Sequence, residues 1–113
     1  MIDDKHYQIL IDNEDFMSVI FKLVECRETN PSATNLKLEA LWILINLAYG
    51  DDEDILKFVA DERFTEAMKI VMLQSQQNFQ VFDLLMFLMC NLTFGPRTRS
   101  LVKEHFDLCS LII

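Results

Sequence analysis

Residues that form turns are scarce in this sequence. Its 113 residues include only two glycines and two prolines. A β-sandwich or β-barrel of this length needs more of both at its turns, so their scarcity argues against an all-β fold. Apolar residues make up 51% of the chain, which is enough to bury a continuous core. The composition therefore favours a single all-α domain.

Positive charge is also in short supply. Ten Lys and Arg residues face 18 Asp and Glu residues, so the formal net charge is −8. This field repels the phosphates of nucleic acids and anionic lipid surfaces, and it attracts cationic groups. We therefore expect a protein or a basic peptide as the partner, and neither a nucleic acid nor a membrane.

The sequence lacks an obvious targeting or membrane-spanning segment. Its first four residues are half acidic, unlike a signal peptide. The most apolar run, residues 81–92, contains Asp83 and is much shorter than a bilayer span. We expect a soluble protein of the cytoplasm, the nucleus or both.

Paired cysteines and catalytic motifs are missing as well. Cys26, Cys90 and Cys109 show no paired spacing, which predicts reduced thiols that act as small apolar residues within helices. His105 lies four residues before Cys109, but no second pair accompanies them, so we expect no metal site. The sequence contains no recognisable nucleophile, nucleotide-binding or cofactor motif. We therefore expect neither an enzyme nor a cofactor.

The chain repeats itself at an offset of 45 residues. The segment from Trp42 to Gly50 (WILINLAYG) matches the segment from Phe87 to Gly95 (FLMCNLTFG) in residue type, position for position. This period falls in the range of about 40–47 residues that is typical of HEAT and armadillo arrays. It predicts one right-handed α-solenoid domain over residues 1–113, with armadillo repeats at about 5–50 and 51–95 and an incomplete third at 96–113.

Each full repeat should contain a short, a medium and a long helix. The expected helices cover residues 6–11, 15–28, 34–49, 52–60, 63–74, 77–94, 97–104 and 105–113. Gly50 and Gly95 should end the long helices in the left-handed conformation, and Pro96 should open the next helix. The segment 30–32 (NPS) indicates a loop.

The long helices carry a polar and aromatic stripe. Steps of four, three and four residues place Asn35, Glu39, Trp42 and Asn46 on one helix face. The offset of 45 gives Gln80, Leu84, Phe87 and Asn91 on the next long helix, with Asp83 close beside. The predicted peptide-binding residues are Asn35, Glu39, Trp42 and Asn46 on one helix, with Gln80, Asp83, Phe87 and Asn91 on the other.

This stripe suits an extended peptide. An Asn amide carries both a donor and an acceptor, as a peptide unit does. Packed helices lie about 8–10 Å apart, and two residues of an extended strand advance roughly 6.8 Å, so one Asn per long helix can meet about every second peptide unit. Aromatic rings can hold the stem of Lys or Arg, and Glu39 and Asp83 attract its charge.

Other roles for the same residues stay open at this point. Trp42 and Phe87 could be core aromatics. Asn46 and Asn91 could tie helices together by hydrogen bonds to neighbouring backbone.

The segment from Leu38 to Gly50 (LEALWILINLAYG) resembles the third helix of an importin alpha repeat, which carries Glu-x-x-Trp-x-x-x-Asn. The resemblance implies a non-enzymatic groove that grips extended Lys/Arg-rich peptides of the nuclear localisation signal type, in protein transport. It implies that Trp42 and Asn46 contact the ligand, that Asn91 does so from the next helix, and that Phe87 takes the place of a second Trp.

Two further expectations concern partners. The alternative function is an armadillo scaffold or assembly subunit that packs against a folded protein. The C-terminal segment is predicted to leave apolar side chains uncovered, which favours self-association through that end. These side chains are Leu101, Val102, Phe106, Leu108, Leu111 and Ile112.

Overall fold

The computed structural model describes residues 9–50, 52–93 and 99, and all regular structure in this part is helical. Residues 9–12 form a helical turn. The helices that follow are α2 (Glu14–Glu25), α3 (Pro31–Leu47), α4 (Asp52–Val59), α5 (Glu62–Ser75) and α6 (Phe79–Leu92). The all-α prediction is confirmed for these residues.

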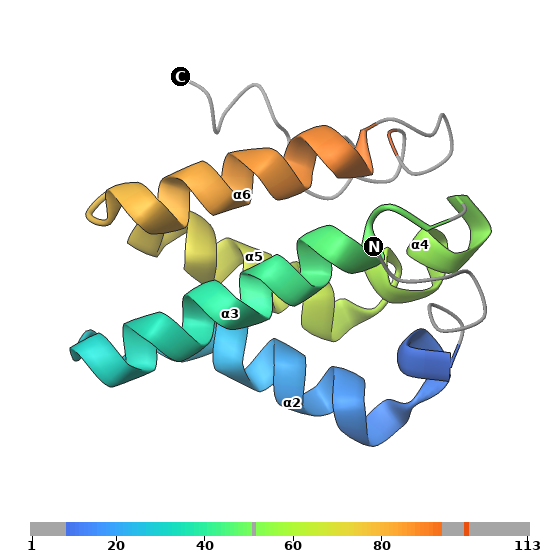
Figure 1. Cartoon of the computed structure of the whole chain (residues 1–113), viewed down its shortest axis with the longest axis horizontal. Helices are drawn as coiled ribbons and strands as arrows, with labels where there is room; N and C mark the ends of the chain where they lie inside the picture. Colours follow the sequence, from blue (N-terminus) through green and yellow to red (C-terminus); the bar gives the residue numbers. More distant parts are fainter. Residues whose placement is uncertain (1–8, 51, 94–98, 100–113) are drawn as a thin grey trace.

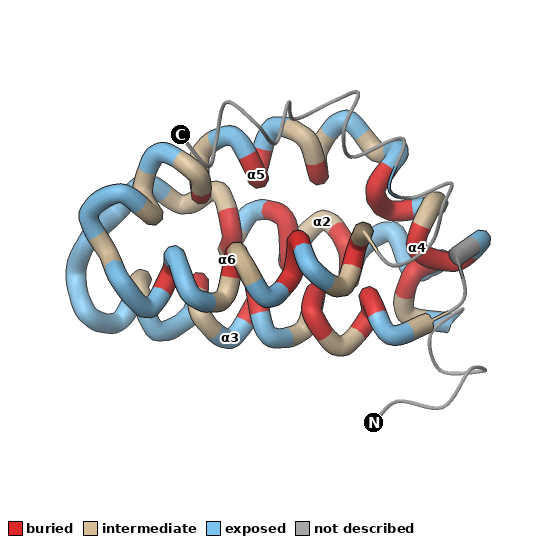
Figure 2. The backbone as a smooth tube through the Cα atoms, turned by 90° about the horizontal axis from the view of Figure 1, so that it is seen from above, coloured by how far each residue is buried: buried red, intermediate tan, exposed pale blue. Residues whose placement is uncertain are grey.

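The helices form two layers. Helix α2 packs antiparallel against α3, and α5 packs antiparallel against α6 (Figure 1). The two pairs then stack, with α2 against α5 in one layer and α3 against α6 in the other, while α4 packs on α5. Buried residues concentrate where the layers face each other (Figure 2). Helices α3 and α6, which carry most of the two segments that repeat in the sequence, therefore lie side by side and run in the same direction.

A cluster of aromatic rings joins the two pairs at the core. Phe64 of α5 is fully buried and packs edge to face against Phe21 of α2, with ring centroids 6.2 Å apart. It packs in the same way against Phe58 of α4, at 5.7 Å. Each buried ring of this size contributes on the order of 1.5–3 kcal/mol through removal of apolar surface from water.

Four of the helices begin at an asparagine or aspartate. Their N-cap residues are Asn13, Asn30, Asp61 and Asn78, and each side-chain oxygen accepts a backbone N–H of the first turn. The predicted loop at residues 30–32 is therefore wrong. Asn30 accepts from the N–H of Ala33 at 2.9 Å, and Pro31 occupies the first helical position, where its missing N–H costs nothing.

The helix ends also differ from the prediction. Helix α2 stops at Glu25, three residues early, because Cys26 takes up extended backbone angles. Helix α3 stops at Leu47 with Ala48 as its cap in the right-handed region, so Gly50 is not the residue that ends it. Gly95, Pro96, the third repeat and the six apolar residues expected to drive self-association lie outside the described residues.

The two helix pairs differ in length. The N-caps Asn13 and Asp61 are 48 residues apart, as are Asn30 and Asn78. The repeated motif, however, recurs after 45 residues. The difference lies within the long helices, because α3 has 17 residues and α6 has 14. Helix α3 therefore starts three residues, close to one turn, earlier relative to its aromatic residue.

Lys37 occupies a buried position on α3. Lys37 is only 2% exposed, whereas its apolar neighbour Leu36 is largely exposed. Its Nζ donates to the carbonyl oxygens of Val24 (2.8 Å) and Cys26 (2.5 Å) and to Oε1 of Gln74. Burial lowers the pKa of Lys37. The Lys37 side chain thus caps the C-terminal end of α2 and links it by hydrogen bonds from α3 to α5.

Cys26 and Cys90 are free thiols, as predicted, but neither is fully buried. Cys26 is a partly exposed cap at the end of α2, and Cys90 is exposed on α6. Cys90 follows Phe79 by eleven residues, close to three turns, so both lie on the side of α6 that faces away from the core. Cys109 lies outside the described residues.

Candidate functional site

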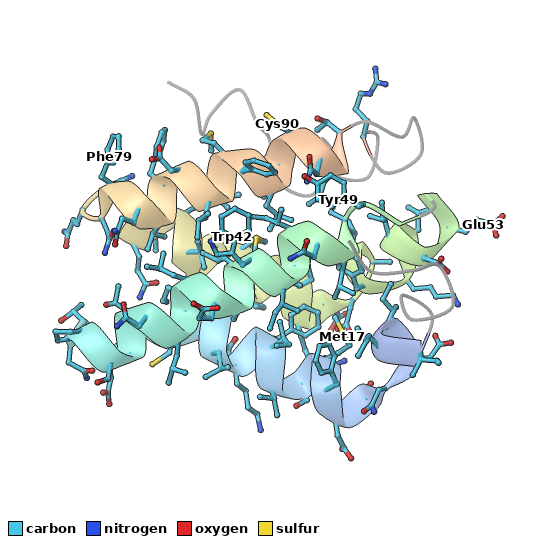
Figure 3. The ribbon with its side chains drawn as sticks, in the orientation of Figure 1. Met17, Trp42, Tyr49, Glu53, Phe79 and Cys90 are labelled. Carbon is cyan, nitrogen blue, oxygen red and sulfur yellow. The ribbon has the colours of Figure 1, made fainter. Side chains whose placement is uncertain are left out.

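Trp42 and Phe87 form one aromatic surface across the junction of α3 and α6. Their ring centroids lie 5.9 Å apart and their planes are inclined by 54°. Trp42 is 44% exposed and Phe87 42%, so neither is a core residue. Figure 3 shows Trp42 between the two helices. We call this pair the aromatic platform; because the rings touch, nothing can insert between them.

Two carboxylates lie one turn before the aromatic platform. Glu39 precedes Trp42 by three residues and Asp83 precedes Phe87 by four, which is about 4.5–6 Å along each helix. Both residues are exposed. Among the described residues, neither carboxylate has an ion-pair partner, whereas Asp12, Glu14, Asp61 and Glu66 each pair with a cation. The site therefore presents unneutralised negative charge beside its rings.

Two amides lie one turn after the aromatic platform, and they differ. Nδ2 of Asn46 donates to the carbonyl oxygen of Trp42 at 3.0 Å, within its own helix. Nδ2 of Asn91 is shielded from solvent and has no hydrogen-bond partner in the described part of the chain. Asn46 therefore does not tie helices together. A buried donor left without a partner costs about 1–3 kcal/mol.

The remaining predicted residues lie farther along the same helices. Asn35 and Gln80 are both exposed, seven residues before Trp42 and Phe87 respectively. The backbone N–H of Gln80 donates to Oδ1 of Asn78, which fixes the start of α6. Every predicted site residue thus belongs to α3 or α6. The pair Trp42 and Phe87 brings the two halves of the predicted set into contact across these helices.

Tyr49 is an exposed aromatic residue that the prediction left out. It follows Trp42 by seven residues and lies just past the end of α3, on the side of α6 (Figure 3). A spacing of seven residues returns to the same helix face, so the sequence did contain a signal for this residue. Tyr49 extends the apolar surface beyond Asn46.

The described residues offer few other kinds of site. They contain no cluster of three or more His, Cys, Asp or Glu side chains placed to hold a metal ion. Within the same residues, every helix is too short or too polar to cross a bilayer.

Comparison with protein-family models, curated proteins and solved structures gives no match to this chain.

Proposed function

We propose that the surface of α3 and α6 binds an extended Lys/Arg-rich segment of another protein, and that the chain is a non-enzymatic, right-handed solenoid of the armadillo type. Support for the solenoid comes from the two stacked helix pairs, α2–α3 and α5–α6. The resemblance of residues 38–50 to the importin alpha third helix supports the same fold and suggests recognition of nuclear localisation signals. A role of this kind belongs to the cytoplasm and the nucleus.

The observation that carries the proposal is the half-exposed aromatic platform, with Nδ2 of Asn91 one turn away and without a hydrogen-bond partner among the described residues. Both features cost free energy in the unbound chain, because a shielded donor lacks its hydrogen bond and two apolar rings face water. A peptide can remove both costs: a side-chain stem covers the rings, and a carbonyl oxygen accepts from Asn91 after its shielded amide turns towards the surface.

Charge defines the kind of peptide. Glu39 and Asp83 lie one turn before the rings and have no ion-pair partners among the described residues. The chain as a whole carries a net charge of −8. A cationic side chain on the platform is attracted by the ring faces and by these carboxylates. Attraction of this kind weakens as salt screens the charges.

The proposal can be tested by titrating the full chain into a fluorescently labelled Lys/Arg-rich peptide and following anisotropy at low and moderate salt. Two repeats offer few contacts, so we expect a dissociation constant from tens of micromolar to millimolar. Salt should weaken binding, and Trp42→Ala should weaken it about fivefold or more. Phe79→Ala is the matched control, because Phe79 is an exposed aromatic of α6 that projects away from α3 (Figure 3).

Asn91→Ala adds a second readout. It should weaken peptide binding and at the same time raise the free energy of unfolding by about 0.5–1.5 kcal/mol, because it removes an unpaired donor and a poor helix former. Asn46→Ala should stabilise less, since its amide already has a partner. An affinity that responds neither to salt nor to Trp42→Ala contradicts the proposal.

A scaffold function is the second candidate, and a different surface favours it. Phe79 is 77% exposed and Leu73 at the end of α5 is also largely exposed, both outside the aromatic platform. These side chains suit a folded partner that covers the edge of α5 and α6. Proximity labelling in cells, followed by pull-down with Phe79→Ala and Leu73→Ala, distinguishes the candidates. One stoichiometric partner lost in these variants, with indifference to basic peptides, would favour the scaffold.

A further inference from the structure

We infer that the aromatic platform selects arginine over lysine in the segment that it binds. This inference rests on the proposed function and specifies its ligand. At a second place in the same chain, an aromatic ring and carboxylates already hold a guanidinium group.

That filled arrangement surrounds Arg63. Its guanidinium carbon lies over the ring of Phe21, 5.3 Å from the centroid. Its Nε donates to Oδ1 of Asp61 at 3.1 Å, and one terminal nitrogen donates to Oδ2 of Asp61 at 2.6 Å. The other terminal nitrogen lies 2.6 Å from a carboxylate oxygen of Glu14. One face of the planar group thus covers a ring while its edges donate to carboxylates.

The aromatic platform has the same components, and no cation from the described part of the chain pairs with them. Trp42 and Phe87 expose part of their surfaces, and Glu39 and Asp83 lie about one turn away on the same helices. A guanidinium stacked on either ring keeps its N–H groups in its own plane, pointing outward. A carboxylate within about one helical turn of the ring can then accept two of them, as Asp61 does from Arg63.

Lysine matches this geometry less well. The rings are in contact at 5.9 Å, so a lysine stem has no gap between them to enter and must lie across their outer surface. Its ammonium is a compact, strongly hydrated charge without a flat face, so it cannot stack on a ring and make a forked contact with a carboxylate together. Both cations gain the same long-range attraction, and only arginine gains the close contacts.

The test uses the full chain and matched peptides of one sequence, in which every basic position is Arg, Lys, citrulline or asymmetric dimethylarginine. We expect the Arg peptide to bind about tenfold more tightly than the Lys peptide at the same net charge. Dimethylarginine keeps the charge but blocks N–H donors, so it should lose most of this advantage. Citrulline should bind weakest.

Single-residue variants test which side chains cause the preference for the Arg peptide over the Lys peptide. Trp42→Ala should reduce the Arg over Lys ratio to within about twofold, while Trp42→Phe should keep part of it. Glu39→Gln and Asp83→Asn should weaken the Arg peptide more than the Lys peptide, and Phe79→Ala should leave the ratio unchanged. Equal affinity for the Arg and Lys peptides, with sensitivity to Trp42→Ala, overturns this inference and leaves the proposed function standing. Absence of binding to every peptide overturns both.

Discussion

The ammonium group of Lys37 lies among three oxygen acceptors, the carbonyls of Val24 and Cys26 and the side chain of Gln74. An ammonium has three N–H donors, so its hydrogen-bonding capacity is filled. Its charge lies at the C-terminal end of α2, where the helix dipole is negative. Hydrogen bonds and the dipole together offset part of the cost of burying this cation, and the lowered pKa of Lys37 reflects the cost that remains.

Replacing Lys37 should therefore destabilise the fold. Lys37→Met keeps the apolar stem but leaves the carbonyl of Val24 and Oε1 of Gln74 without this donor, while the carbonyl of Cys26 keeps its hydrogen bond from Nε2 of Gln74. We therefore expect the free energy of unfolding to fall by about 2–4 kcal/mol. Urea unfolding followed by circular dichroism measures it. Lys22→Met, at an exposed position of α2, is the control and should stay within about 0.5 kcal/mol. Equal stability of the two variants would show that the cluster contributes nothing.

The same lysine gives a dependence on pH. Burial lowers the pKa of folded Lys37 below 10.5, so between the two pKa values the unfolded chain binds more protons. The stability of the wild type should rise, relative to Lys37→Met, as pH increases through the folded pKa towards 10.5. A difference that stays constant over this range contradicts the assignment.

At the scale of the helices, the N-caps set where each element begins. Asn78 is the clearest example, since its Oδ1 accepts from the N–H groups of Gln80 (3.0 Å) and Val81 (3.2 Å). Asn78→Ala should lower the free energy of unfolding by about 1 kcal/mol, because two donors of the first turn lose their acceptor. Thermal and urea unfolding test this. Asn78→Asp keeps the acceptor and should change stability little, and equal losses in both variants would exclude capping as the cause.

The existence and order of these helices could be predicted from the sequence. The predicted start of α4 is correct and the starts of α2 and α5 are correct to within one residue, but α3 begins three residues earlier than predicted. Apolar residues with helical spacing indicated α2 to α6. Asn30 and Pro31 were interpreted as a loop because the same residues favour turns and helix starts. Lys37 was missed because counting apolar residues cannot show that a long side chain bends back to a helix end.

For the candidate site as well, the sequence predicted which residues lie near one another but not how they make contact. The offset of 45 residues was enough to predict that Trp42 and Phe87 lie on neighbouring helices. Direct ring contact and the unpartnered amide of Asn91 depend on helix separation and on rotamers, which the sequence pattern does not contain.

At the scale of the whole molecule, Arg63 joins the two helix pairs by pairing with Glu14 at the start of α2 and with Asp61 at the start of α5. The hydrogen bond from Arg63 is the main cause that lowers the pKa of Asp61. Asp61 is also the N-cap of α5, so its charge stabilises both the helix and the junction between the pairs.

This arrangement predicts a loss of stability in acid. Asp61 has a folded pKa below its unfolded value of 3.8, so its contribution is present above that value and disappears as pH falls through the folded pKa. Asp61→Asn keeps the cap oxygen but removes the charge. The wild type should be more stable than Asp61→Asn at neutral pH, and the difference should shrink to nothing in acid. Unfolding measured at stepwise lower pH checks this, and a difference that persists in acid would contradict it.

The chain contains a single tryptophan, and that indole lies on the aromatic platform. Excitation at the red edge of protein absorption therefore reports on one place in the molecule. A bound side chain shields the indole from water and shifts its emission to shorter wavelength, while global unfolding shifts it to longer wavelength. Shifts of the emission maximum in opposite directions thus distinguish peptide binding at the aromatic platform from unfolding in a single unlabelled sample.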